Sequence, residues 1–427
     1  MVYIDCCVQG LISSKKYLLE YENKYKGFNF NLIRTKRCLK IQLPFTQGRL
    51  EIITGPVGSI KDSLLEQEVN RLVHSKFADK FGLVVVQHPK DNNGSSRRGE
   101  HSSLVTEKVD NIFEQIKQDT RILILGGASH YKDPNIVHLV NSLVESGRIV
   151  VASGLNLDSQ GQPYNHMPSL MARAHAVTLA KAVCSYGNCH NTEANRSIKI
   201  NGNFKAQCPT HYYRNVSGSK TEAGTLTLYV GSMFADKSTG WRTHIKKLKE
   251  AGFNPLVIKH AGDERCGLED EIWFHDGSKY PATNIAEITE LDDLLKQKPN
   301  TQDICIDEGQ FFPGIYDKVF SLMSQGYNIN MTGLPLTFNL SSFGEVPKLM
   351  CLADTIFLNT AICVQCGHPA SYSQRLKPIE GIVQPAPFDD MEFLPGAAES
   401  YEARCFDCLE IPGREPNKYQ IEKLKLK

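Results

Sequence analysis

The sequence has no long apolar segment and no marked excess of charge of either sign. No apolar run reaches the roughly 18 residues that a membrane-spanning helix needs, so we expect no membrane partner. The formal net charge is +1 at pH 7, and without a basic stripe we expect no nucleic-acid partner. The first residues also lack the ordered regions of a secretory signal. These absences together predict a cytoplasmic protein.

Cysteine is plentiful, but its pattern argues against a disulfide framework. The chain holds 13 cysteines, an odd number in a long sequence without a secretory signal. Two groups have metal-ligand spacing, and such groups form closed, structural zinc sites. The CxxC…CxxC group comprises Cys363, Cys366, Cys405 and Cys408. The less regular group comprises Cys184, Cys189, Cys208 and His211. Four unrelated residues remain the alternative reading of this less regular group.

The chain contains an internal repeat. Each copy begins with an apolar strand and a glycine, in LEIITGPVGSIKDS and LTLYVGSMFADKST. Each has a middle apolar strand, in RILILGGASHY and DICIDEGQFF, and a later one, in GRIVVASGL and GYNINMTGL. Because these strands alternate with helical patterns, we expect a parallel α/β sheet in each copy. The predicted segments are an N-terminal extension of unknown role (1–47), a first domain (48–214), a polar linker (215–224), a second domain (225–411) and a basic tail (412–427).

The second copy carries a candidate phosphate-binding loop between a strand and a helix-like segment. Backbone N–H groups and the helix dipole of such a loop face an anion. We expect Lys237 to reach the β- and γ-phosphates of ATP and Ser238 to help hold Mg²⁺. Asp236 stands where the usual pattern has glycine; aspartate tolerates left-handed backbone but adds negative charge near the phosphates. A lysine–serine turn without a ligand is the alternative. The predicted loop comprises Gly231, Ser232, Met233, Phe234, Ala235, Asp236, Lys237, Ser238 and Thr239.

An acidic pair follows the middle strand of the second copy. Asp307 and Glu308 come directly after DICI, and ligands of open α/β sheets bind at the carboxyl ends of the strands. Asp307 is therefore a candidate to hold Mg²⁺, and Glu308 a candidate to accept a proton from an attacking hydroxyl. A solvated acidic turn is the alternative.

The second copy resembles the zinc-containing thymidine kinases across nearly its whole length. Four stretches in family order carry the resemblance: GSMFADKST; IKHAGDERCGLEDEIWFHDGSKYPA; DICIDEGQFFPGI; and AICVQCGHPASYSQRL with LPGAAESYEARCFDC. The resemblance implies that Glu308 is the base acting on the nucleoside 5′-hydroxyl and that Arg265 stabilises the transferring phosphoryl group. It adds Asp307 and Gln310 to the ATP and Mg²⁺ site. It also implies a slot for the nucleobase lined by Met233, Phe311, Leu334, Phe338, Phe343, Ser373 and Tyr401.

The first copy resembles the same family more weakly. Ile60 and Asp62 replace loop residues, and Gly126-Gly127 stand in place of the acidic pair. Because glycine offers neither a Mg²⁺ carboxylate nor a base, we expect a non-catalytic domain with a scaffold role. The predicted fold is α/β, with two P-loop NTPase-like parallel-sheet domains, each followed by a small zinc-ribbon and lasso subdomain.

The resemblance implies ATP-dependent phosphorylation of thymidine to thymidine monophosphate by the second domain, with ATP, Mg²⁺ and Zn²⁺ as cofactors. Deoxyuridine is an alternative nucleoside. The alternative function, which Asp236 favours, is a catalytically impaired pseudokinase that binds a nucleotide or a partner. A homo-oligomer is compatible with the sequence.

Overall fold

The structure is a computed structural model that describes residues 47–74, 82–91, 103–262, 271–273, 279–379, 381–391, 400–419 and 421. The predicted N-terminal extension lies outside these residues except for Gln47. Arg265 also lies outside them.

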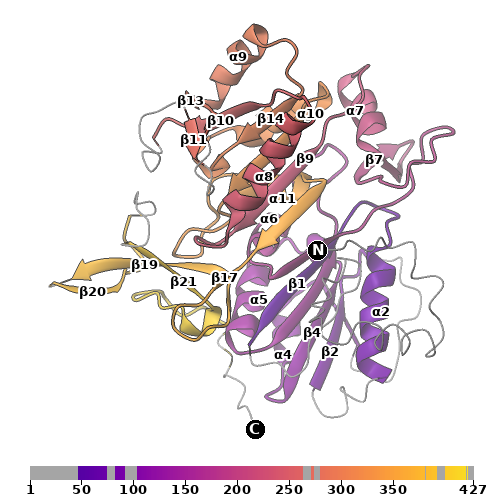
Figure 1. Ribbon diagram of the computed structural model, residues 1–427. Coiled ribbons are helices and arrows are strands. Elements are labelled where there is room, and N and C mark those ends of the chain that lie inside the picture. The colour runs from indigo at the N-terminus through magenta and orange to yellow at the C-terminus, as the bar shows by residue number, and fades with distance from the viewer. Residues whose placement is uncertain are drawn as a thin grey trace, which may run out of the picture. The chain divides into compact units, whose positions relative to one another are not determined.

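The first half of the chain contains a six-stranded parallel sheet in the order β3-β2-β4-β5-β1-β6. Its strands are near-continuous apolar runs, as expected for a parallel sheet covered on both faces; β5 reads IVVASG with every residue buried. Helices α2 and α5 pack against strands β1 and β5 (Figure 1). The elements are β1 (Arg49–Thr54), α2 (Lys61–His74), β2 (Gly82–Gln87), β3 (Ser103–Val105), α4 (Val109–Glu114), β4 (Thr120–Gly126), η2 (Ala128–His130), α5 (Asn135–Glu145), β5 (Ile149–Gly154), α6 (Met167–Ala172) and β6 (Ala176–Leu179).

The second half repeats this sheet strand for strand, in the order β13-β10-β14-β15-β9-β16, again all parallel. The predicted α/β fold with two parallel sheets is therefore confirmed. The elements are β9 (Leu226–Gly231), α8 (Lys237–Glu250), β10 (Leu256–His260), β11 (Glu271–Trp273), β12 (Lys279–Pro281), β13 (Thr283–Ile285), η4 (Ile288–Glu290), α9 (Leu291–Gln297), β14 (Asp303–Ile306), η5 (Gly309–Phe311), α10 (Ile315–Ser324), β15 (Asn328–Gly333), α11 (Val346–Leu352) and β16 (Thr355–Asn359).

A small β subdomain with one metal-ligand cluster follows each sheet, and the two differ in length. In the first half, two strands are joined by the two-residue turn Asn201-Gly202, both at positive φ, which is the backbone that a tight hairpin requires. In the second half, the corresponding strands are separated by residues 380–400. The elements are β7 (Arg196–Ile200), β8 (Asn203–Gln207), α7 (Pro209–Ser217), β17 (Ala361–Ile362), β18 (Pro369–Ala370), β19 (Tyr372–Ile379), β20 (Ile382–Pro385), β21 (Tyr401–Arg404) and η6 (Phe406–Cys408).

Equivalent elements of the two halves contact each other. Helix α6 packs on α11, and β6 lies against β16, as in a two-fold interface between like subunits. Arg196 of the first half, which is buried, joins the two halves. Its guanidinium lies 3.7 Å from the Asp354 carboxylate and donates to the Leu352 carbonyl at 2.9 Å. Burial of polar groups is tolerated here because they are paired, so the halves form one packed unit.

Two of the predicted segments continue into neighbouring structure. Residues 215–217, expected in the linker, form the last turn of α7. The tail, expected to be a separate basic segment, returns to the first half as far as residue 419. Tyr419 is almost fully buried, and its hydroxyl donates to Asp110 at 2.7 Å. Its ring packs edge-on against Phe113, with centroids 5.3 Å apart. The buried Tyr419 ring and its hydrogen bond to Asp110 therefore attach this segment to the first half.

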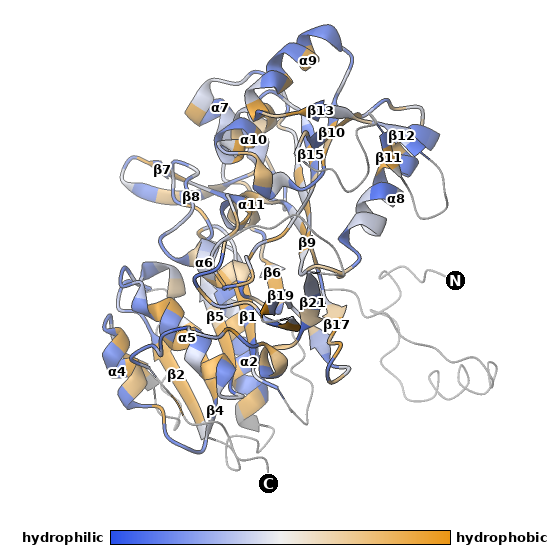
Figure 2. Cartoon of the chain, turned by 90° about the vertical axis from the view of Figure 1, so that its left-hand side faces the viewer, coloured by the Kyte–Doolittle hydropathy of each residue, from blue (hydrophilic) through white to orange (hydrophobic). Residues whose placement is uncertain are grey.

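Apolar residues gather in the strands, and polar residues on the outer helices. Figure 2 shows β2 and β4 mostly orange, whereas α9 is mostly blue. Within the described ranges, no helix is long and apolar enough to cross a lipid bilayer.

Candidate functional site

The predicted phosphate loop connects β9 to α8 and is tied to the neighbouring β subdomain. Gly231 has φ 157°, and a side chain there would meet the Asn359 carbonyl oxygen at 2.2 Å. The Met233 N–H donates to Ser373 Oγ at 2.9 Å. Lys237 is buried, and its ammonium donates to the Ser232 carbonyl at 2.8 Å across the loop. These contacts give the loop a closed shape with its lysine held inside.

Asp236 adopts the left-handed backbone that glycine usually supplies at this point, with φ 55° and ψ 34°. Its side chain is exposed and makes no capping hydrogen bond to α8. Its carbonyl accepts a hydrogen bond from the Asn359 amide at 3.3 Å. The backbone conformation is strained for a residue with a side chain, though aspartate tolerates it better than most. Exposure to water weakens the field of its charge at the phosphate loop.

The acidic pair lies at the carboxyl end of β14 and is oriented by a threonine from the adjacent strand. The Thr332 hydroxyl donates to Asp307 Oδ1 at 2.5 Å and accepts from the Glu308 N–H at 2.9 Å. Thr332 belongs to β15, which pairs with β14. Because one hydroxyl serves both residues, it fixes the position of Asp307 relative to Glu308.

Gln310 connects Glu308 to the loop after β15. Its amide nitrogen donates to Glu308 Oε2 at 2.6 Å, and its amide oxygen accepts from the Leu334 N–H at 3.1 Å. Glu308 has a left-handed backbone with φ 51°, which turns its side chain away from the course of β14. Strained residues of this kind are concentrated at functional sites. The arrangement presents an oriented carboxylate at the end of β14, which is separated by β15 from β9, the strand that leads into the predicted phosphate loop.

The predicted nucleobase residues fall into four contact groups. Phe311 and Phe343 meet edge to face, with ring centroids 5.7 Å apart, and His260 lies 5.7 Å from Phe311. Met233 is joined to Ser373 by the hydrogen bond described above. The Leu334 N–H is held by the amide oxygen of Gln310. The Arg375 guanidinium lies over the buried Phe338 ring, 5.2 Å from its centroid, and Arg375 pairs with Tyr401 across β19 and β21.

Sequence reasoning missed two residues of this site, Thr332 and His260. The signal for His260 was present in the repeat. His88 directly follows β2, the strand equivalent to β10, and its ring packs on Tyr131 at 4.8 Å as the His260 ring packs on Phe312 at 5.0 Å. Thr332 gave no signal, because a strand threonine is common in buried sheets.

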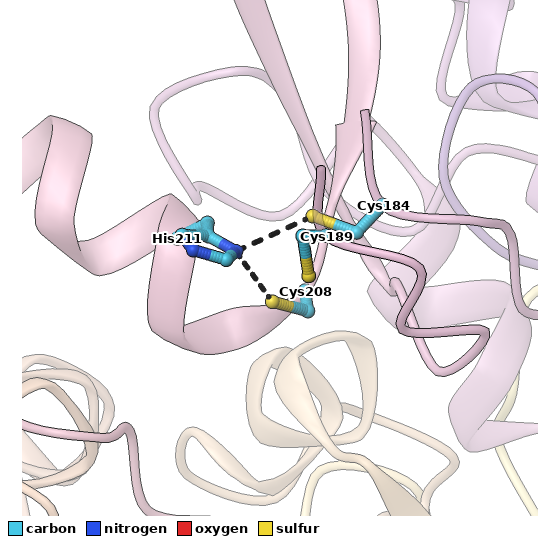
Figure 3. Close-up of side chains that lie close together, drawn as sticks. All are labelled: Cys184, Cys189, Cys208 and His211. Atoms are coloured by element: carbon cyan, nitrogen blue, oxygen red, sulfur yellow. Dashed lines mark hydrogen bonds between the residues drawn. The ribbon is translucent and has the colours of Figure 1, made fainter. Parts of the chain in front are cut away.

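In each of the two metal-ligand clusters, the four ligand atoms all lie within 4.8 Å of one another. In the first half, Nδ1 of His211 lies 3.5 Å from the Cys184 sulfur and 3.2 Å from the Cys208 sulfur, with Cys189 beside them (Figure 3). In the second half, the Cys366 and Cys405 sulfurs are 3.5 Å apart. Three cysteines with one histidine, and four cysteines, are donor sets that suit tetrahedral zinc, so both clusters can hold a metal ion.

The first half keeps the frame of the site without its acids. Gly127 follows β4 as Glu308 follows β14, and it too has a left-handed backbone, with φ 70°. The Val57 N–H donates to Ser197 Oγ at 3.0 Å, as the Met233 N–H does to Ser373. The first half thus keeps the backbone conformation and the hydrogen bond of the second half, but not the side chains of the acidic pair.

A comparison with protein families agrees with this internal repeat. The family model described as thymidine kinase matches residues 48–211 and again residues 224–409. The two matched segments cover most of the chain and correspond to the two sheets with their β subdomains. This chain, with its two consecutive copies of the fold, belongs to the thymidine kinase family.

Proposed function

We propose that the second half transfers the γ-phosphoryl group of ATP to the 5′-hydroxyl of thymidine, giving thymidine monophosphate and ADP. The observation that carries this proposal is the oriented acidic pair, in which Thr332 joins Asp307 to Glu308 and Gln310 holds the Glu308 carboxylate. Family membership supports phosphorylation of a nucleoside. The first half, which has Gly126-Gly127 at the same place, is proposed to be non-catalytic.

Glu308 is the proposed general base. A carboxylate held by a neighbouring amide is prepared to accept the proton of an attacking hydroxyl. Asp307 supplies oxygen ligands of the kind that Mg²⁺ prefers, and Lys237 supplies positive charge next to the ATP phosphates. Arg265, outside the described residues, is proposed to stabilise the transferring group. The protein then acts by positioning the reactants and by stabilising charge.

The proposed nucleoside is thymidine, with deoxyuridine as the alternative. Phe311 and Phe343 form an edge-to-face pair beside the acidic pair, and a flat pyrimidine fits an apolar slot of aromatic side chains with few polar groups. The two nucleosides differ by one methyl group, which is worth only about 1 kcal/mol in an apolar site. We therefore expect a preference for thymidine rather than exclusion of deoxyuridine.

Zinc is proposed to be structural in both β subdomains, because closed sets of four cysteine or histidine ligands leave no position for a substrate.

A second candidate function, a pseudokinase that binds without turnover, is favoured by Asp236 in the phosphate loop. The exposure of the Asp236 side chain argues for the active enzyme, since solvent screens its charge.

The test is formation of thymidine monophosphate by the purified chain with ATP, Mg²⁺ and thymidine or deoxyuridine. Glu308→Gln should abolish turnover while thymidine still binds in calorimetry. Glu250→Gln, an exposed change at the end of α8, is the matched control and should leave the rate unchanged. Turnover by Glu308→Gln would remove the base assignment. Thymidine binding without any product in the unaltered chain would replace the kinase by the pseudokinase.

A further inference from the structure

The first half contains a cavity of about 590 Å³ at the carboxyl edge of its sheet. Residues from the loops after β1, β4 and β5 line it, together with the β7–β8 hairpin. This is the edge at which parallel α/β sheets bind ligands, and the volume is that of an ordinary small-molecule site.

The cavity preserves the aromatic geometry of the second half with more polar rings. His130 and Tyr164 meet edge to face with centroids 5.7 Å apart and planes at 87°. Phe311 and Phe343 meet at the same 5.7 Å and at 85°. The loop carrying each second ring has the same closure, because Tyr164 N–H donates to Asn156 O as Phe343 N–H donates to Pro335 O, both at 3.0 Å. A flat ring can therefore be accepted in both halves.

Phe204 extends this aromatic surface at the mouth of the cavity. By the pairing of β7 with β8, it corresponds to Tyr401 in the pairing of β19 with β21. Tyr401 is 7% exposed, whereas Phe204 is 54% exposed and lines the cavity. The tight turn at Asn201-Gly202 leaves out the chain that separates the equivalent strands in the second half. The Lys199 ammonium lies over the Phe204 ring, 5.6 Å from its centroid, so Phe204 adds an aromatic surface with a cation on one side of it at the cavity mouth.

Lysines supply the charge of this cavity. Lys61 takes the place of the phosphate-loop Lys237 and is buried at the start of α2, 3.3 Å from Asp62. Lys90 and Lys132 are exposed at the cavity wall. Two carboxylates, those of Asp91 and Asp158, also line the cavity and accept hydrogen bonds from neutral donors. Asp91 accepts from the Gln87 amide at 3.0 Å, and Asp158 accepts from two N–H groups of its own loop.

We propose that this cavity binds a nucleotide with a polyphosphate chain and does not turn it over. The aromatic rings receive the base, and Lys61, Lys90 and Lys132 face the phosphates. Gly126-Gly127 stand where the second half has Asp307 and Glu308, so the cavity has no counterpart of the proposed base and holds the nucleotide without turnover. The first half is therefore a second nucleotide site that does not carry out the reaction proposed for the second half.

The experiment measures nucleotide binding to the full chain carrying Lys237→Ala, which removes the phosphate-loop lysine of the second half. Equilibrium dialysis with ATP and with thymidine triphosphate should find one site per chain. Adding Lys61→Ala should weaken this site at least tenfold, because a phosphate contact is lost. Lys117→Ala, an exposed change in the same half, is the control and should have no effect.

Three results would overturn the proposal. They are no binding of either nucleotide to the Lys237→Ala chain, binding that Lys61→Ala leaves unchanged, and inorganic tripolyphosphate binding as tightly as the nucleotides. Because Lys61 is buried, Lys132→Glu provides a second variant on the surface. It should weaken binding roughly tenfold through reversal of one charge, and unchanged affinity would also count against the site. Thymidine phosphorylation is read separately through Glu308, so either proposal can fail alone.

Discussion

The guanidinium group of Arg173, at the end of α6 in the first half, donates a hydrogen bond to the carbonyl oxygen of Leu340 in the second half. Leu340 has φ 68° and lies in the loop that runs from Leu336 to Phe343, where the proposed nucleobase residues Phe338 and Phe343 are found. Burial lowers the pKa of Arg173 to about 10, so the side chain stays charged at neutral pH. The hydrogen bond from this charged group to Leu340, a residue with left-handed backbone, holds the loop from Leu336 to Phe343 in one conformation.

Replacement of Arg173 is expected to weaken thymidine binding without removing the chemistry. Arg173→Met loses a charged hydrogen bond worth about 2 kcal/mol, which corresponds to a roughly thirtyfold rise in the KM for thymidine if it acts wholly on the loop. The KM for ATP should stay the same, and Arg173→Lys should recover part of the loss. Arg214→Met, on the exposed side of α7, is the control. An equal rise in both KM values would mean that Arg173 stabilises the chain generally.

Replacement of Asp236 is expected to lower a KM, the one for ATP, whereas replacement of Arg173 is expected to raise the KM for thymidine. Asp236→Gly removes both the negative charge and the strain of a left-handed residue, and Asp236→Asn removes the charge alone. We expect both variants to lower the KM for ATP by roughly threefold to tenfold at low ionic strength, because a screened charge near phosphate costs about 1 kcal/mol. The effect should shrink in high salt. Steady-state kinetics with Asp119→Asn as the control would show this, and unchanged ATP kinetics in both variants would show that the loop tolerates Asp236.

Much of the fold could be predicted because its signals are local. The buried strands are continuous apolar runs, and the repeat supplied their order twice, so both sheets followed from the sequence. The metal-ligand clusters followed from spacing, which brings Cys363 and Cys366 together within one turn. These features depend on residues close together along the chain.

The contacts between the halves could not be predicted for the converse reason. Arg196 and Asp354 are far apart in sequence, and neither differs from an ordinary surface residue until α6 packs on α11. The same holds for Tyr419, which reads as part of a polar tail until its ring reaches Phe113. The cavity of the first half was also missed, since the sequence shows the loss of acids at Gly126-Gly127 but not the retained geometry of His130 and Tyr164.

Metal content should separate the two clusters. We expect about two zinc ions per chain by atomic absorption, since each set of four ligands suits one ion. Cys366→Ser and Cys189→Ser should each remove one ion and lower the melting temperature. His368→Ala is the control, because its ring lies 3.3 Å from the Cys366 sulfur but outside the set of four. Loss of zinc in His368→Ala with retention in Cys366→Ser would replace one ligand by the other.

His175 predicts how stability depends on pH. Its Nδ1 accepts a hydrogen bond from the Leu50 N–H at 3.2 Å, and its ring packs against Tyr372 of the second half with centroids 6.1 Å apart. Burial, and then the charge of Arg49, lower the pKa of His175 to about 4. An unfolded histidine has a pKa of about 6.5. Between these values the unfolded chain binds a proton that the folded chain excludes.

The free energy of unfolding should therefore fall as the pH drops from about 6.5 toward 4, and this residue should contribute no change above that range. The full effect is at most about 3 to 4 kcal/mol, because the two pKa values differ by about 2.5 and each pH unit corresponds to about 1.4 kcal/mol. Urea unfolding at about pH 7.5 and pH 5 should show that the unaltered chain loses roughly 2 kcal/mol more than His175→Asn, whose amide oxygen can still accept from Leu50. His138→Asn, at an exposed position of α5, is the control and should behave like the unaltered chain. Equal losses in the unaltered chain and in His175→Asn would mean that His175 accepts its proton without opening the contact with Tyr372.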